Sequence, residues 1–110
     1  MMRDLRWSPA EKIVARKVFD QALQLELKEI VEQIQDIAAK VEGARDLWDL
    51  ERWLTKRRSA IERKYDYRYS MLPFVFATLL NEGRVSRDDL RGLGQEKFEL
   101  IQRIASPDYE

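Results

Sequence analysis

The chain has 110 residues, the usual length of one domain, and it contains 45% apolar and 36% charged residues but only four glycines and three prolines. This mixture is typical of helices with one buried and one solvated face and argues against many short β-strands, so we predict an all-α protein. Without cysteine or histidine it lacks the residues of disulfides, most metal sites and most hydrolytic triads, and its 20 basic and 20 acidic residues leave no excess charge for nucleic acid.

The first predicted helix begins at Ser8, because Ser8-Pro9-Ala10-Glu11 has the spacing of a capping box with proline at the first helical position. No glycine or proline follows before Gly43, so we expect the helix to reach about Val41, a length of roughly 50 Å. Residues 1–7 have no periodic pattern and are predicted to form a flexible arm, although Trp7 could dock just before the helix.

Two apolar stripes run along this helix. One repeats every three or four residues, as in a coiled coil, and consists of Leu23, Leu27, Ile30, Ile34, Ile37 and Val41. The other widens the apolar face toward the N-terminus and consists of Ile13, Val14, Val18, Phe19, Ala22 and Leu25. A monomer whose other helices are shorter cannot bury both stripes, so we predict a homodimer.

The second predicted helix begins at Asp46 as its N-cap and ends near Lys64 or Tyr65. Its inward positions are Leu47, Leu50, Leu54 and Ile61. Residues 52–68 carry a net charge of plus five, whereas residues 20–42 carry minus four. Such opposite charges can pair in an antiparallel arrangement or present a basic surface to an acidic partner.

Shorter helices are predicted for the rest of the chain. Residues 71–80 are nearly all apolar, and Pro73 stands either in the first turn after a Ser70 cap or at a kink of a longer helix. Another helix opens at Ser86 and stops at Gly92 or Gly94. The last runs from Gln95 to about Ala105, with Phe98, Ile101 and Ile104 facing inward. We therefore expect one domain, in which residues 8–64 form a helical arm and residues 65–110 a helical head.

Few residues suggest catalysis or metal binding. The acid pairs Asp46/Asp49 and Asp88/Asp89 stand where helices need caps, and Lys56-Arg57-Arg58 lacks an accompanying nucleic-acid motif. The tyrosines at 65, 67 and 69 favour a packed corner over an enzyme site made with Lys64 and Asp66. Trp48 and Trp53 cannot both face one core; either one reaches a partner, or Trp48 packs across the dimer and Trp53 lies under arginines.

Motifs spread over most of the chain share one pattern. They are Trp7-Ser8, Asp46-Leu47-Trp48, Arg57-Arg58, Ile61, Lys64-Tyr65-Asp66-Tyr67-Arg68-Tyr69-Ser70, Phe74-Val75-Phe76-Ala77, Leu79-Leu80 and Glu82-Gly83, followed by Leu90, Leu93, Lys97 and Ile101. Together they resemble the fluorescence recovery protein family. The resemblance implies a dimeric, cofactor-free helical protein, not an enzyme, which binds the photoactivated orange carotenoid protein of cyanobacteria, speeds its return to the orange state and ends phycobilisome quenching.

The resemblance also implies a set of interface residues. Those for the dimer or the partner are Leu47, Trp48, Leu50, Glu51, Arg52, Arg58 and Phe74. The family typically has His and Asp where this chain has Glu51 and Arg52, and a lysine of the head is replaced by Leu100, so the same scaffold with another protein partner is the alternative. With no signal peptide and no apolar run of roughly 20 residues, we expect a cytoplasmic protein that does not insert into membranes, peripheral to thylakoid-associated phycobilisomes.

Overall fold

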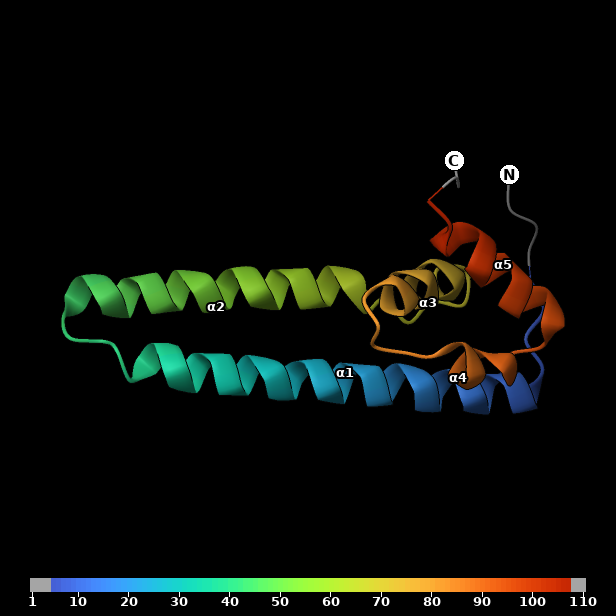
Figure 1. Cartoon of the computed structure of the whole chain (residues 1–110), viewed down its shortest axis with the longest axis horizontal. Helices are drawn as coiled ribbons and strands as arrows, with labels where there is room; N and C mark the ends of the chain where they lie inside the picture. Colours follow the sequence, from blue (N-terminus) through green and yellow to red (C-terminus); the bar gives the residue numbers. More distant parts are fainter. Residues whose placement is uncertain (1–4, 108–110) are drawn as a thin grey trace.

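The protein consists of a two-helix arm and a helical head, as the computed structural model of residues 5–107 shows (Figure 1). The helices are α1 (Pro9–Ala38), α2 (Ala44–Lys64), α3 (Leu72–Asn81), α4 (Arg87–Arg91) and α5 (Gln95–Ala105), and the described residues contain no strand, which confirms the all-α prediction. The chain measures 53 × 28 × 20 Å, and its radius of gyration of 17.1 Å exceeds the roughly 13 Å of a compact chain of this length. The elongation comes from the arm, in which α1 and α2 run antiparallel.

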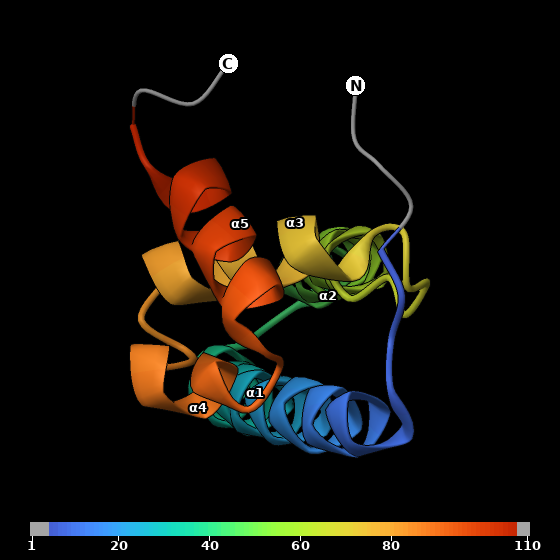
Figure 2. The ribbon, with the colours of Figure 1, turned by 90° about the vertical axis from the view of Figure 1, so that its right-hand side faces the viewer.

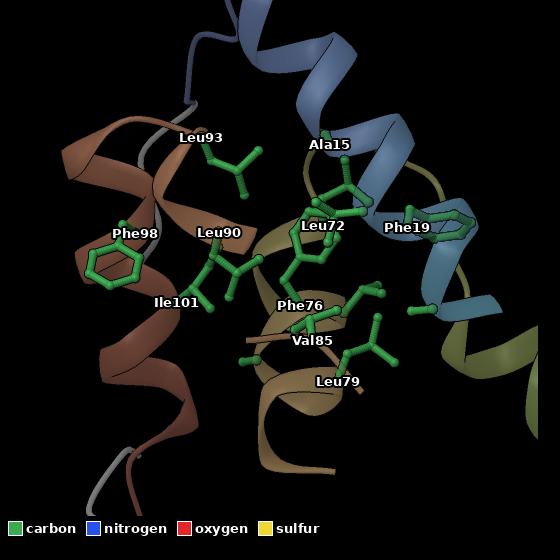
Figure 3. Packing of buried hydrophobic residues seen from close by; sticks show 14 residues of the cluster. Ala15, Phe19, Leu72, Phe76, Leu79, Val85, Leu90, Leu93, Phe98 and Ile101 are labelled. Atoms are coloured by element: carbon green, nitrogen blue, oxygen red, sulfur yellow. The ribbon is translucent and has the colours of Figure 1, made fainter. Parts of the chain in front are cut away.

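The head packs against the N-terminal half of α1. Viewed along the arm, α3 lies between α2 and α5, and α4 sits beside α1 (Figure 2). Side chains from all parts of the head meet in one core, to which α3 contributes Leu72, Phe76 and Leu79 (Figure 3). The other large members of the core are Phe19, Val75, Val85, Leu90, Leu93, Phe98 and Ile101. The head is therefore held by ordinary apolar burial.

Local capping sets several helix ends where the sequence predicts them. The Ser8 hydroxyl accepts the Glu11 N–H, and the Glu11 carboxylate accepts the Ser8 N–H, which completes the capping box of α1. Ser86 and Asp89 form the same reciprocal pair at the start of α4. Pro73 stands in the first turn of α3, but Met71 and not Ser70 is the N-cap residue.

The start of α2 and the end of α1 differ from the prediction. α1 ends at Ala38, and residues 39–42 connect it to Gly43, which caps α2 in extended conformation. Asp46 is thus already inside α2, where its carboxylate accepts the Glu42 N–H at 3.2 Å. The sequence analysis predicted Asp46 as the N-cap because Gly43 has no side chain that could form a recognisable capping hydrogen bond.

The inward faces of α1 and α2 also need correction. Ile13 and Leu25 are 72% and 56% exposed, because the head contacts α1 through Ala15, Val18 and Ala22, at the next helical positions. On α2, Leu50 and Ile61 are only half-buried, and Leu47 and Leu54 are exposed. No side chain of α2 is fully buried, since none of residues 5–107 covers the arm as a third layer.

The last two residues of the predicted arm over residues 1–7 contact the head, and Trp7 docks just before α1, as the sequence allowed. The Lys97 ammonium donates to the Arg6 carbonyl at 2.5 Å and stands 4.9 Å from the centre of the Trp7 ring, and Trp7 packs against the head core. A buried lysine and an aromatic ring therefore fix this segment. Residues 1–4 lie outside the described residues, as do residues 108–110.

Candidate interaction surface

The described residues show surfaces for contact and no metal centre. Among residues 5–107 no group of carboxylates is arranged to hold a metal ion. None of the helices there has the length and apolar character that a membrane span requires.

One face of the arm is apolar and uncovered. Leu27 and Val31 are exposed one turn apart on α1, and Leu47 and Leu54 are 47% and 42% exposed on α2. On each helix the exposed pair lies about a quarter turn around the axis from the residues that face the other helix, and the rotation has the same sense in both. Because the two helices run antiparallel, both pairs lie on the same side of the hairpin. We call these four residues the apolar arm face. Such a surface is typical of protein–protein contact.

All the predicted site residues except Phe74 lie on α2. Trp48 is exposed near the arm tip, Glu51 accepts a hydrogen bond from Thr55 at 3.0 Å, and Arg52 pairs with Asp49. Arg58, further toward the head, makes a 3.6 Å ion pair with Glu62 at a largely exposed site. Exposed pairs of this kind contribute little stability, so these side chains remain available to a partner.

Phe74 lies apart from the others, half-buried on α3 in the head. Leu100, the departure that the resemblance suggests for the head, is buried on α5. Along α2 alone, the helix between Leu47 and its end at Lys64 spans roughly 26 Å. Within one chain, the predicted site residues therefore form an arm group and a separate head position.

A charged cluster that the sequence analysis missed joins the arm to the head. Its centre is Glu26, which is 2% exposed. The Glu26 carboxylate accepts hydrogen bonds from Lys64 Nζ and the Tyr65 hydroxyl, both at 2.8 Å, and pairs with Arg84 Nε at 3.3 Å. Glu82 bridges the two cations, with 2.8 Å contacts to Lys64 and to Arg84. We call Glu26, Lys64, Tyr65, Glu82 and Arg84 the junction cluster.

The junction cluster is electrostatically matched. Burial, together with the hydrogen bond to Glu26, raises the pKa of Tyr65 far above its ordinary value, so the hydroxyl stays a donor. Burial alone would raise the pKa of Glu82, but hydrogen bonds from Lys64 and Arg84 outweigh it, and the pKa lies below its ordinary value. Lys64 and Tyr65 are thus committed to holding a buried carboxylate, which is an anchoring role. The position of Glu26 four residues after Ala22, on the same inward stripe, is the one sequence feature that indicates its burial.

The tyrosines form the packed corner that the sequence predicts. Tyr65 and Tyr67 both meet the Phe19 ring edge-on, with centroids 5.4 and 4.8 Å away. Tyr69 contacts Trp7 at 5.3 Å, and the Arg16 guanidinium lies 4.2 Å from the centre of the Tyr67 ring. These contacts fix the segment between α2 and α3 against α1.

Fold and surface together define a class: an all-helical domain with a two-helix arm whose outer surfaces are available for recognition. The chain belongs to the fluorescence recovery protein family. The profile of the family described as photoprotection regulator fluorescence recovery protein matches residues 7–105. The fluorescence recovery protein of Synechocystis sp. is 38% identical over 99 residues, which cover 90% of this chain and 91% of that protein.

Solved structures agree with this assignment. The fluorescence recovery protein of Fremyella diplosiphon is 37% identical, with a TM-score of 0.84 over 91% of this chain and 98% of the other. The structure from Synechocystis sp. is 38% identical, with a TM-score of 0.85 over the same shares. The relatives are named as regulators of photoprotection and not as enzymes.

Proposed function

We propose that this protein binds the photoactivated orange carotenoid protein, accelerates its return to the orange state and thereby ends phycobilisome quenching. The observation that carries the proposal is the family match over residues 7–105, which includes the exposed α2 residues Trp48 and Arg58. The same proposal places the protein in the cytoplasm, beside thylakoid-associated phycobilisomes.

The proposed activity requires no chemical step. A protein that speeds a conformational return must contact the compact arrangement of its partner, or the transition state toward it, more favourably than the open arrangement. The arm supplies Trp48, Glu51, Arg52 and Arg58 for such contacts, and the head supplies Phe74. Aromatic and arginine side chains are the types that contribute most to protein interfaces.

A homodimer formed through the apolar arm face is part of the proposal. Leu27, Val31, Leu47 and Leu54 expose apolar surface that a second copy would remove from water, with Leu50 beside them at the seam. A two-fold interface pairs the same patch of both copies. The apolar arm face suits such an interface because its leucine side chains can pack against the same leucines of a second copy.

The deciding experiment follows the red-to-orange absorbance change in the dark, with and without this protein. A dose-dependent acceleration is expected. Arg58→Glu is expected to weaken it, while Arg87→Glu, an exposed change on α4, serves as the matched control. If a verified helical dimer produces no acceleration, the proposed partner is wrong. The departures at Glu51, Arg52 and Leu100 would then favour the same scaffold with another protein partner.

A further inference from the structure

A groove crosses the seam between α1 and α2 near the arm tip. It consists of two hollows of about 300 and 380 Å³ that share Ile37 and Trp53 in their lining, so that they adjoin across these two side chains. Leu50 adds to the apolar lining of one hollow, and Lys40 stands beside it. Asp36 and Arg57 line the other.

The groove lies on the face of the arm away from the apolar arm face. Each residue advances an α-helix by about 100° around its axis. On α2, Trp53 and Leu54 therefore lie on opposite sides of the inward positions Leu50 and Arg57. On α1 the hollows are lined by Asp36 and Lys40, whereas Val31 is on the opposite flank. A dimer formed through the apolar arm face would therefore leave the groove open.

The groove contains polar groups without partners. Arg57 Nε is buried and has no acceptor among the described residues, while its guanidinium lies 5.9 Å from the centre of the Trp53 ring. The side chains of Asp36 and Lys40 likewise make no hydrogen bond or ion pair within residues 5–107. No hydrogen bond or ion pair within residues 5–107 engages the terminal N–H groups of the Arg57 guanidinium either, so these polar groups can pair with an occupant without first breaking a contact.

We propose that this groove binds an extended segment of the partner protein with apolar side chains at alternate positions. An extended backbone has free carbonyl groups for the terminal N–H groups of Arg57 and free N–H groups for Asp36, whereas a helix has already used its own. Side chains two residues apart point to the same side of an extended segment and would enter the two hollows on either side of Trp53. The identity of the partner rests on the proposed function above.

The test measures recovery of the photoactivated orange carotenoid protein with variants of the groove. Trp53→Ala and Asp36→Arg are each expected to raise the concentration for half-maximal acceleration about tenfold or more, the loss of roughly 1.4 kcal/mol that hot-spot contacts exceed. Glu32→Arg makes the same charge change on α1 outside both hollows and is expected to leave that concentration within about twofold. Circular dichroism and light scattering verify fold and mass of each variant.

A second readout does not depend on truncating Trp53. With 5-fluorotryptophan in this chain alone, ¹⁹F resonances of Trp7, Trp48 and Trp53 are assigned by single Trp→Phe changes, and unlabelled photoactivated partner is added. The Trp53 resonance is expected to shift while the Trp7 resonance, in the head, keeps its position. Normal acceleration by both groove variants with an unshifted Trp53 resonance overturns the groove assignment alone. Groove variants that dissociate the dimer overturn it in favour of a contact between copies, and absent acceleration by the unmodified chain overturns the proposed function and this partner with it.

Discussion

Lys97 and Glu11, which are 86 residues apart in the chain, form a 2.9 Å ion pair that ties the last helix to the first. The Lys97 side chain is almost fully buried, and its ammonium also holds the Arg6 carbonyl. The Glu11 carboxylate therefore has two roles, because it binds Lys97 of α5 and also accepts the Ser8 N–H at the start of α1. This contact closes the head around the N-terminal segment.

Lys97→Met should release the N-terminal segment. The change leaves the Arg6 carbonyl and the Glu11 carboxylate without their buried donor, which we expect to lower the free energy of unfolding by about 2 kcal/mol. Urea unfolding at fixed protein concentration measures the loss, and a red shift of tryptophan emission reports the release of Trp7. Lys17→Met, at an exposed position of α1, is the control; equal effects of both changes would contradict the role of Lys97.

Glu26→Gln should weaken the junction of arm and head. It keeps the shape of the side chain but removes the negative charge that faces Lys64 and Arg84, and breaking a buried pair in this way costs about 3 kcal/mol. Urea unfolding followed by circular dichroism checks the value. Glu29→Gln, which removes a solvent-exposed partner of Arg84, should have a much smaller effect. An unchanged midpoint for Glu26→Gln would mean that apolar packing alone fixes the junction.

Stability should be insensitive to pH near neutrality and fall in acid. The Ser8 N–H and Lys97 hold the pKa of Glu11 below its ordinary value of 4.5, and Lys64 and Arg84 do the same for Glu82 against the effect of burial. A carboxyl whose pKa is lower in the folded state stabilises the fold above its unfolded pKa, and this contribution disappears as the pH falls through the folded value. Urea midpoints should be flat from about pH 5 to 8, since the chain has no histidine, and drop below about pH 4.5. A transition between pH 6 and 7 would contradict this assignment.

Leu54→Glu should separate the proposed dimer. The glutamate would place a charge in the centre of the apolar arm face, where a second copy would have to desolvate it. Light scattering should give the mass of one chain while circular dichroism keeps the helical signal, since Leu54 is exposed within the chain. Leu25→Glu changes a leucine that is also exposed, outside the apolar arm face, and should leave the mass unaltered. A dimer that survives Leu54→Glu would show that the copies meet through another surface.

Local chemistry made part of the fold predictable. Ser8 with Glu11 and Ser86 with Asp89 define helix starts through residues three apart, and the structure has these caps as expected. The start of α2 was missed because Gly43 acts through its backbone alone. The helices of the head follow from apolar periodicity and breakers, so α5 runs from Gln95 to Ala105 as predicted.

Contacts between distant residues were not predictable from such patterns. The helical spacing places Glu26 on the inward stripe of α1, but no pattern shows that Lys64 and Arg84, far along the chain, pair with it. Ile13 and Leu25 belong to an apolar stripe by their sequence spacing, but the head contacts only part of that stripe and leaves these two side chains exposed. For the same reason the groove around Trp53 could not be foreseen, because it exists only where α1 and α2 lie side by side.

The continuity of α1 gives the molecule a mechanical property. Its 30 residues pass from the head core to the arm tip without an internal glycine, and its only proline is in the first turn, so no position along roughly 45 Å favours a kink. Between the head core and the arm tip, the connection over residues 39–43 is therefore where the path of the chain can change direction. The arm tip and the core residues Ala15 and Phe19 are therefore joined by one straight helix. A partner that contacts both the tip and the head must match the fixed distance between them.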